Sequence, residues 1–252
     1  MLKLAGASLL SVAAACNTAE ELRRDLGPNG SLAHGGSGGL DRELSGTSPL
    51  TLLPQDKGNE SPACLDGSPY GFYFTPSKTG STKWTISIEG GGWCYDEQEC
   101  YSRSKMDLGS SKGWRKEAGC GCMNVKNGDE STSPLDEDCN CLYMPYGDGA
   151  SFSGYRPDPW PVPGQNGETL TFRGIKNFDA TIDWAMAHGL DKATEFVLTG
   201  GSAGGLSTFL HMDRVAARLE KEAPSCKKIT GALASRTDSI CDHSLATWKL
   251  SD

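Results

Sequence analysis

The feature that most constrains the fold is a short string of small residues between two apolar segments. Residues Gly200-Gly201-Ser202-Ala203-Gly204 match the pattern G-x-S-x-G. They follow a short apolar run and open a segment with apolar residues at helical spacing. A strand-to-helix turn of this kind is so sharp that side chains two positions before and after the serine would collide. The context predicts a nucleophile elbow around Ser202; a glycine-rich turn that binds a phosphate, or no ligand, is the alternative.

The segments around this turn alternate between strand and helix patterns. Aromatic and β-branched runs predict strands at 70–74, 84–88, 141–146, 195–199 and 229–234. Apolar residues at helical spacing predict one helix over 175–186 and another with a stripe of Leu206, Phe209, Leu210, Val215 and Leu219. This order indicates βαβ units, hence an α/β fold with a mostly parallel sheet and flanking helices. Residues 103–140 have no periodicity and predict a disulfide-rich insertion.

A second glycine-rich string directly follows the predicted strand 84–88. It reads Glu89-Gly90-Gly91-Gly92-Trp93-Cys94. Hydrolases with a nucleophile elbow place such a loop after an early strand, where its amides stabilise an oxyanion. A flexible turn is the alternative, but three glycines lose much conformational entropy on folding. The two strings together predict an acyl-transfer site, with the amide of Ala203 as one oxyanion donor.

Several strings stand in order along the chain: Cys64-Leu65-Asp66-Gly67-Ser68, Ile88-Glu89-Gly90-Gly91-Gly92-Trp93-Cys94, Cys100-Tyr101-Ser102-Arg103-Ser104, Leu108-Gly109-Ser110-Ser111, Tyr146-Gly147-Asp148-Gly149-Ala150-Ser151-Phe152-Ser153-Gly154, Phe172-Arg173-Gly174 and Gly201-Ser202-Ala203-Gly204-Gly205. Together they resemble the pectin acetylesterase family, which also contains animal carboxylesterases that remove a fatty acyl group from a signalling protein. The resemblance covers residues 64 to about 234.

The resemblance implies an α/β-hydrolase-like fold and a role for each of five residues. Ser202 would be the catalytic nucleophile, and the amides of Gly91, Gly92 and Ala203 would form the oxyanion hole. Trp93 would lie at the mouth of the acyl pocket. One position departs from the pattern: plant members carry cysteine where this chain has Gly201, so a disulfide found there would be absent here.

The resemblance fades after about residue 234, before the Asp and His that should follow the serine. In this fold the triad order is Ser, then Asp, then His, and 50 residues remain after Ser202 (252 − 202). Nothing in them matches the family's Asp and His motifs. We therefore expect a domain over 61–252 that is truncated at its C-terminus. His243, with Asp238 or Asp242, is a weak candidate base, and structural roles are expected for His188 and His211.

The N-terminal region predicts secretion. Residues 1–15 have the basic start, apolar run and small residues of a signal peptide. A buried N-terminal helix and a lipoprotein signal ending at Cys16 are the alternatives. Residues 16–60 are rich in Gly, Ser and charge and predict a linker or pro-segment. Asn29 and Asn59 begin glycosylation sequons.

Ten cysteines fit a secreted chain and predict disulfides. Cys94 and Cys100 are close enough in sequence to close a small loop. The two C-x-C pairs, Cys120/Cys122 and Cys139/Cys141, leave a zinc site as the alternative, although they are tighter than the usual zinc knuckle.

Charge and length exclude several classes of protein. The net charge of −8 argues against nucleic acid, because Lys and Arg are needed to neutralise phosphates. The apolar run near the N-terminus is too short to span a membrane. We expect no metal and no cofactor; the sequence makes no prediction of oligomeric state. The motifs and the resemblance together imply a secreted carboxylic-ester hydrolase; that its substrate is an acetylated polysaccharide such as pectin, or another acyl ester, is what the resemblance implies. The alternative is a non-catalytic family member that binds a glycan or lipid.

Overall fold

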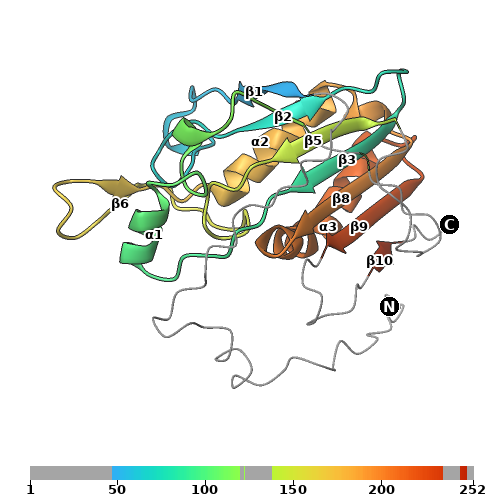
Figure 1. Ribbon diagram of the computed structural model, residues 1–252. Helices are drawn as coiled ribbons and strands as arrows, with labels where there is room; N and C mark the ends of the chain where they lie inside the picture. Colours follow the sequence, from blue (N-terminus) through green and yellow to red (C-terminus); the bar gives the residue numbers. More distant parts are fainter. Residues whose placement is uncertain (1–46, 120–121, 123–137, 235–244, 249–252) are drawn as a thin grey trace, which may run out of the picture. The chain divides into compact units, whose positions relative to one another are not determined.

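The computed structural model of the chain describes residues 47–119, 122, 138–234 and 245–248. Eight strands form one sheet in the order β10-β9-β8-β3-β5-β2-β1-β4 (Figure 1). In sequence order their bounds are β1 Ser48–Leu52, β2 Gly71–Thr75, β3 Lys83–Ile88, β4 Glu117–Ala118, β5 Asn140–Met144, β8 Glu195–Gly201, β9 Lys228–Ala234 and β10 Leu245–Trp248. A separate antiparallel pair joins β6 (Trp160–Pro161) to β7 (Thr169–Leu170).

The centre of the sheet is parallel. Strands β5, β3, β8 and β9 pair in parallel, with Ile86 opposite Leu142 on one side and Leu198 on the other. The strands flanking this centre, β2 and β10, are antiparallel to their neighbours. The predicted α/β class, with a mostly parallel sheet and flanking helices, is therefore confirmed for the strands that carry the glycine-rich strings.

Two long helices cover one face of the sheet. Helix α2 is Gly174–Ala187 and α3 is Ala203–Glu222. They lie side by side: Phe178 of α2 stacks on His211 of α3 at 4.1 Å between ring centroids, and Arg214 pairs with Asp179. The shorter helix α1, Glu97–Arg103, begins where the Asp96 side chain accepts a hydrogen bond from the amide of Glu99 at 2.8 Å. Single 3-10 turns are η1 (Gly58–Glu60), η2 (Ser111–Gly113) and η3 (Leu190–Lys192).

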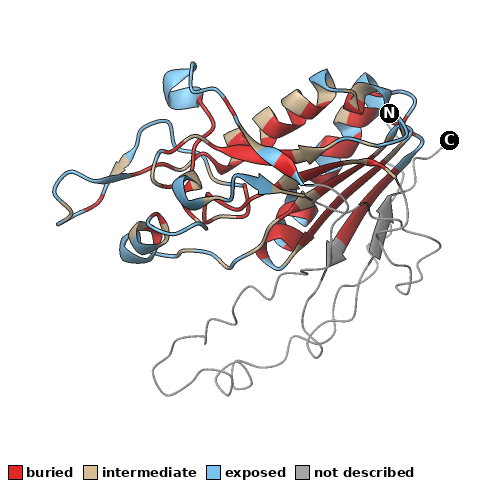
Figure 2. Cartoon of the chain, turned by 45° about the horizontal axis from the view of Figure 1, so that its top comes forward, coloured by how far each residue is buried: buried red, intermediate tan, exposed pale blue. Residues whose placement is uncertain are grey.

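The hydrophobic core lies between these helices and the sheet. In β3, alternate residues Trp84, Ile86 and Ile88 are buried in the same cluster as Phe178 and Met212 of the helices. Figure 2 shows the buried residues concentrated on the strands and on the inner sides of the helices. This alternation is what a strand with one face on a core requires.

All seven predicted helices and strands are present, but the predicted stripe of α3 is wrong at its start. Val215 and Leu219 are buried, whereas Leu206, Phe209 and Leu210 are exposed. The buried side of the first turns consists of small and polar residues, which include Ala203, Gly204, Ser207, Thr208 and His211. Small residues face the sheet here because the helix starts too close to it for larger side chains.

The predicted linker is wrong at its C-terminal end. Residues 48–52 form β1, which pairs with β2 through Leu50 opposite Tyr73 and also pairs with β4. The segment is apolar enough (Pro-Leu-Thr-Leu-Leu) to add an edge to the sheet, and Leu53 is buried in the core. The predicted signal peptide, and the linker up to residue 46, lie outside the described residues and stay predictions.

Disulfides are present, as predicted. Cys94 is bonded to Cys100 and Cys122 to Cys139, and Cys141 is also disulfide-bonded. These bonds favour the disulfide interpretation of the C-x-C pairs over zinc. Two cysteines, Cys64 and Cys226, are buried free thiols.

The packing of α3 predicts that two phenylalanines on neighbouring helices contribute very differently to stability. Phe178 has no exposed area, whereas Phe209 is 64% exposed. Replacing a fully buried phenylalanine with alanine costs about 3–5 kcal/mol because a cavity remains, so we expect this loss for Phe178→Ala. We expect Phe209→Ala to change the free energy of unfolding by less than about 1 kcal/mol. Urea unfolding of both variants tests this, and equal losses would contradict the assigned faces of α3.

Candidate active site

Ser202 lies at a strained turn between β8 and α3. Its backbone has φ 53° and ψ −121°, which is rare for a residue with a side chain. A Cβ added to Gly200 would lie 2.4 Å from the carbonyl oxygen of Gly204, and one added to Gly204 would lie 2.3 Å from that of Ile88. Both positions therefore require glycine. This geometry is that of the nucleophile elbow that the string predicted, and Ser202 is an exposed residue.

The glycine loop, residues 90–93, lies directly against this turn. A Cβ on Gly90 would be 2.3 Å from the Gly201 carbonyl oxygen, 3.2 Å from the Ser202 Cβ and 3.3 Å from the Ala203 amide nitrogen. The two strings, more than 100 residues apart in sequence, are thus in contact. They meet because β3 and β8 are parallel neighbours, so their carboxyl ends lie at the same edge of the sheet.

The next two residues of the glycine loop adopt conformations that favour glycine. Gly91 has φ 147° and Gly92 has φ 68°. A Cβ on Gly91 would also lie 2.8 Å from the side chain of Leu108. The amides of Gly91, Gly92 and Ala203, which the sequence predicted as oxyanion donors, belong to this junction of loop and elbow.

Ser151 links the glycine loop to α3. Its hydroxyl accepts a hydrogen bond from Nε1 of Trp93 at 2.8 Å and donates one to the carbonyl oxygen of Ala203 at 2.7 Å. Its amide donates to the hydroxyl of Tyr146 at 2.9 Å. The indole of Trp93 is therefore fixed beside the first turn of α3, although 37% of the residue is exposed.

Asp148 organises the turn that carries Ser151. It is 1% exposed, and its Oδ2 accepts a hydrogen bond from the amide of Phe152 at 2.9 Å. Ser151 and Phe152 have φ of 52° and 58°, so this carboxyl supports two residues in the left-handed region. Burial raises the pKa of Asp148 from 3.8 to about 7, against the opposing effect of backbone hydrogen bonds and of Arg103.

A second, half-buried carboxyl lies just before the glycine loop. Glu89 Oε2 accepts a hydrogen bond from the amide of Tyr146 at 2.7 Å, and Glu89 also bonds the hydroxyl of Tyr143. Burial raises the pKa of Glu89. These contacts tie the end of β3 to β5 and the turn after it, so Glu89 has a structural role.

Neither described histidine contacts Ser202. His211 is buried, its Nε2 bonds the carbonyl oxygen of Phe152 at 3.1 Å, and burial lowers its pKa. His188 stacks on Trp184 at 3.7 Å and bonds the Trp184 carbonyl through Nδ1. These contacts support the structural roles expected for both. His34 and His243 lie outside the described residues, so the structure does not test the weak prediction for His243.

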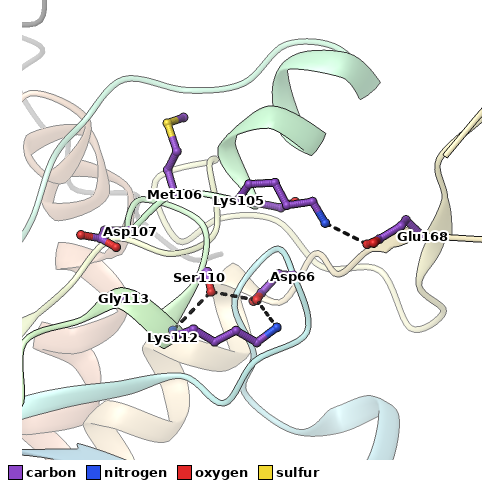
Figure 3. Close-up of a pocket in the computed structure, with 9 residues that line it drawn as sticks. Asp66, Lys105, Met106, Asp107, Ser110, Lys112, Gly113 and Glu168 are labelled. Carbon is purple, nitrogen blue, oxygen red and sulfur yellow. Dashed lines mark hydrogen bonds and ion pairs between the residues drawn. The ribbon is translucent and has the colours of Figure 1, made fainter.

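A hollow of about 330 Å³ lies beside the segment between α1 and η2, away from Ser202. Figure 3 shows two ion pairs among its lining side chains, Lys112 with Asp66 at 3.0 Å and Lys105 with Glu168 at 2.8 Å, and a further carboxylate, Asp107, outside these pairs. None of the residues that line this hollow belongs to the elbow or to the glycine loop, so it is not our candidate site.

The described residues contain no cluster of side chains able to hold a metal ion. Within the same residues, no helix is long and apolar enough to cross a membrane.

A family model described as pectinacetylesterase matches residues 43–246. The chain belongs to the pectinacetylesterase family. It is 39% identical to pectin acetylesterase 5 of Arabidopsis thaliana over 161 residues, and this aligned region covers 64% of this chain and 36% of that relative. It is 32% identical to the human palmitoleoyl-protein carboxylesterase NOTUM over 168 residues, and this aligned region covers 65% of this chain and 32% of that relative.

A solved structure of the Wnt deacylase Notum from Drosophila shows the same fold. It has a TM-score of 0.59 and 26% sequence identity, with 74% of this chain and 52% of that chain covered. The chain therefore spans about a third of the length of the two family members compared above and about half of the solved one.

Sequence reasoning found the elbow and the glycine loop but not the residues that brace them. Arg103, Asp148 and Ser151 lie within strings on which the resemblance to the family rests, yet no spacing in the sequence connects them to Ser202. Their roles depend on contacts between segments that are far apart in sequence. The one available signal was the length of the string 146–154, which is longer than a simple turn needs.

The raised pKa of Asp148 predicts a pH dependence of stability. Between about pH 4 and pH 7 the folded state binds this proton and the unfolded state does not, so the free energy of unfolding should fall as pH rises. Asp148→Asn keeps an acceptor for the amide of Phe152 but cannot titrate. We expect the stability of the wild type relative to this variant to decrease across that window. Urea unfolding of both proteins at about pH 4, 5.5 and 7 measures this. The same change of unfolding free energy with pH in both proteins would contradict it.

Proposed function

We propose that this chain is a secreted carboxylic-ester hydrolase that removes acetyl groups from a cell-wall polysaccharide such as pectin, with Ser202 as its nucleophile. The observation that carries the proposal is the contact between Gly90 and the Ser202–Ala203 turn. This contact puts a strained, exposed serine beside a glycine-rich loop whose amides are candidate oxyanion donors. Such a pair is the minimum arrangement for acyl transfer through an oxyanion.

In the proposed reaction, Ser202 Oγ attacks the carbonyl carbon of the acetyl ester and passes its proton to a histidine. The carbonyl oxygen becomes an oxyanion held by the amides of Gly91, Gly92 and Ala203. Collapse breaks the bond between the acyl carbon and the sugar oxygen, which receives the proton. Water then attacks the acetyl-serine, releasing acetate and restoring Ser202.

In this proposal, the histidine base and its acidic partner are not among the residues that the structure describes. A serine hydroxyl is a weak nucleophile without a base. Since His188 and His211 are both engaged elsewhere, we expect the 252-residue chain by itself to hydrolyse esters only slowly.

The substrate class is taken from the plant relatives, whose names identify them as pectin acetylesterases. The animal relatives are palmitoleoyl-protein carboxylesterases, so a longer acyl chain is the competing substrate. Trp93 beside the elbow would contact the acyl group in either case. Secretion is supported by the predicted signal peptide and by the disulfides.

The alternative function is non-catalytic binding of a glycan or lipid. It is favoured by one observation: the two described histidines, His188 and His211, form hydrogen bonds to other groups and not to Ser202.

An esterase assay separates these two functions. We expect slow acetate release from acetylated pectin and slow hydrolysis of p-nitrophenyl acetate, both reduced to background in Ser202→Ala. A set of p-nitrophenyl esters of increasing chain length compares acetyl with longer acyl groups.

Ser153→Ala is the matched control, because Ser153 is an exposed serine in the neighbouring turn that we place outside the site. Turnover that survives in Ser202→Ala would refute the nucleophile. A chain with no Ser202-dependent turnover would favour the binding function, and loss of turnover in His243→Ala would identify His243 as the base.

A further inference from the structure

The side chain of Arg103 reaches from the last turn of α1 to the glycine loop. Its Nη2 donates to the carbonyl oxygen of Gly91 at 2.8 Å and to that of Trp93 at 3.2 Å. The guanidinium also lies over the ring of Tyr146, 5.7 Å from its centroid. Its buried Nη1 has no hydrogen-bond partner among the described residues. The hydrogen bonds that this guanidinium forms there thus go to the glycine loop.

The bond to Gly91 determines which way an adjacent amide points. The carbonyl of Gly91 and the N–H of Gly92 belong to one peptide plane, and in a trans peptide they point in opposite directions. A guanidinium that holds the carbonyl on one side therefore holds the Gly92 N–H on the other. Gly92 is one of the proposed oxyanion donors.

Glycines make this constraint necessary. A peptide between two glycines can rotate at little steric cost, because neither residue has a Cβ that excludes positive φ. Gly91 and Gly92 both have positive φ here. Without a partner for the Gly91 carbonyl, the peptide could turn its N–H away from the ester. The same glycines that allow the loop to approach Ser202 thus leave the orientation of its amides unfixed.

The other end of the glycine loop is anchored to the same helix. Cys94, which follows Trp93, is disulfide-bonded to Cys100 in α1, and its amide donates to the carbonyl oxygen of Gly149 at 3.2 Å. The disulfide fixes the position of the loop relative to α1, but it does not reach the Gly91–Gly92 peptide. Arg103 supplies the contact at that peptide.

We propose that Arg103 is a positioning residue for the oxyanion hole: it orients the Gly91–Gly92 peptide so that the Gly92 amide faces the ester carbonyl. This role rests on the proposed esterase function, but the orientation of the peptide is measurable whether or not the chain turns over a substrate.

The test observes the peptide itself. In protein labelled with [1-¹³C,¹⁵N]glycine, a carbonyl-to-amide correlation spectrum shows only Gly–Gly pairs, of which the sequence has six: 35–36, 38–39, 90–91, 91–92, 200–201 and 204–205. The peak that disappears in Gly92→Ala identifies the 91–92 pair. We expect this peak to shift and broaden in Arg103→Ala, while the 200–201 and 204–205 peaks of the elbow stay in place.

Two further variants control for charge and folding. Arg103→Lys keeps the charge but offers no planar fork, so we expect a smaller change at the same peak. Arg156→Ala removes an arginine that stacks on Trp160 elsewhere, and we expect no change. A 91–92 peak that stays in place in Arg103→Ala or Arg103→Lys, or one that moves equally in Arg156→Ala, would overturn the proposal. If Arg103→Ala does not fold, Arg103→Lys decides.

The esterase assay adds a readout that separates this role from general stabilisation. We expect Arg103→Ala to lower the Ser202-dependent kcat by about 10- to 100-fold with KM changed less than about 2-fold, because the misplaced donor acts mainly on the transition state. Absence of Ser202-dependent turnover in the wild type would refute the proposed function and leave the peptide measurement intact. A kcat unchanged in Arg103→Ala would overturn the role of Arg103 and leave the function standing.

Discussion

The rest of the candidate site depends on one close backbone contact, between the carboxyl end of β3 and the first turn of α3. A Cβ on Gly204 would lie 2.3 Å from the carbonyl oxygen of Ile88, and a Cβ on Gly90 would lie 2.3 Å from the carbonyl oxygen of Gly201. No side chain fits at these positions. Because the two backbones approach this closely, the exposed residue Ser202 lies directly against the glycine loop.

Close approach through glycine has a consequence for rigidity, since glycine restricts the backbone least. The structure compensates with contacts from outside the loop. Ser151 connects Trp93 to the carbonyl of Ala203, Arg103 holds two loop carbonyls, and the Cys94–Cys100 disulfide joins the loop to α1. Preorganised donors stabilise a developing charge better than mobile ones, so such braces are what an oxyanion hole needs.

The order of elements, the elbow and the glycine loop could be predicted from the sequence because each depends on local pattern. Apolar periodicity sets the strands and helices, and the glycines at 200 and 204 mark the sharp turn. The inner face of α3 could not be predicted in this way. There only small residues fit close to the sheet, so Ala203, Gly204 and Ser207 are buried while Phe209 is exposed. An apolar stripe therefore does not mark the buried side of this part of the helix. Strand β1 was missed because it lies at the end of a polar segment, and the roles of Ser151 and Arg103 depend on contacts that only the fold creates.

The most direct test of the close contact is the free energy of unfolding of Gly204→Ala, because two effects predict opposite signs. Gly204 lies within α3, where helix propensity alone makes alanine about 1 kcal/mol more stable than glycine. A methyl group 2.3 Å from the carbonyl oxygen of Ile88 must instead displace the backbone, which destabilises a packed core by about 1–3 kcal/mol. We predict a net loss of stability for Gly204→Ala, with little change for Gly154→Ala, where the added methyl would be 3.7 Å from Ala150. A Gly204→Ala variant that is more stable than the wild type would contradict the contact on which this account depends.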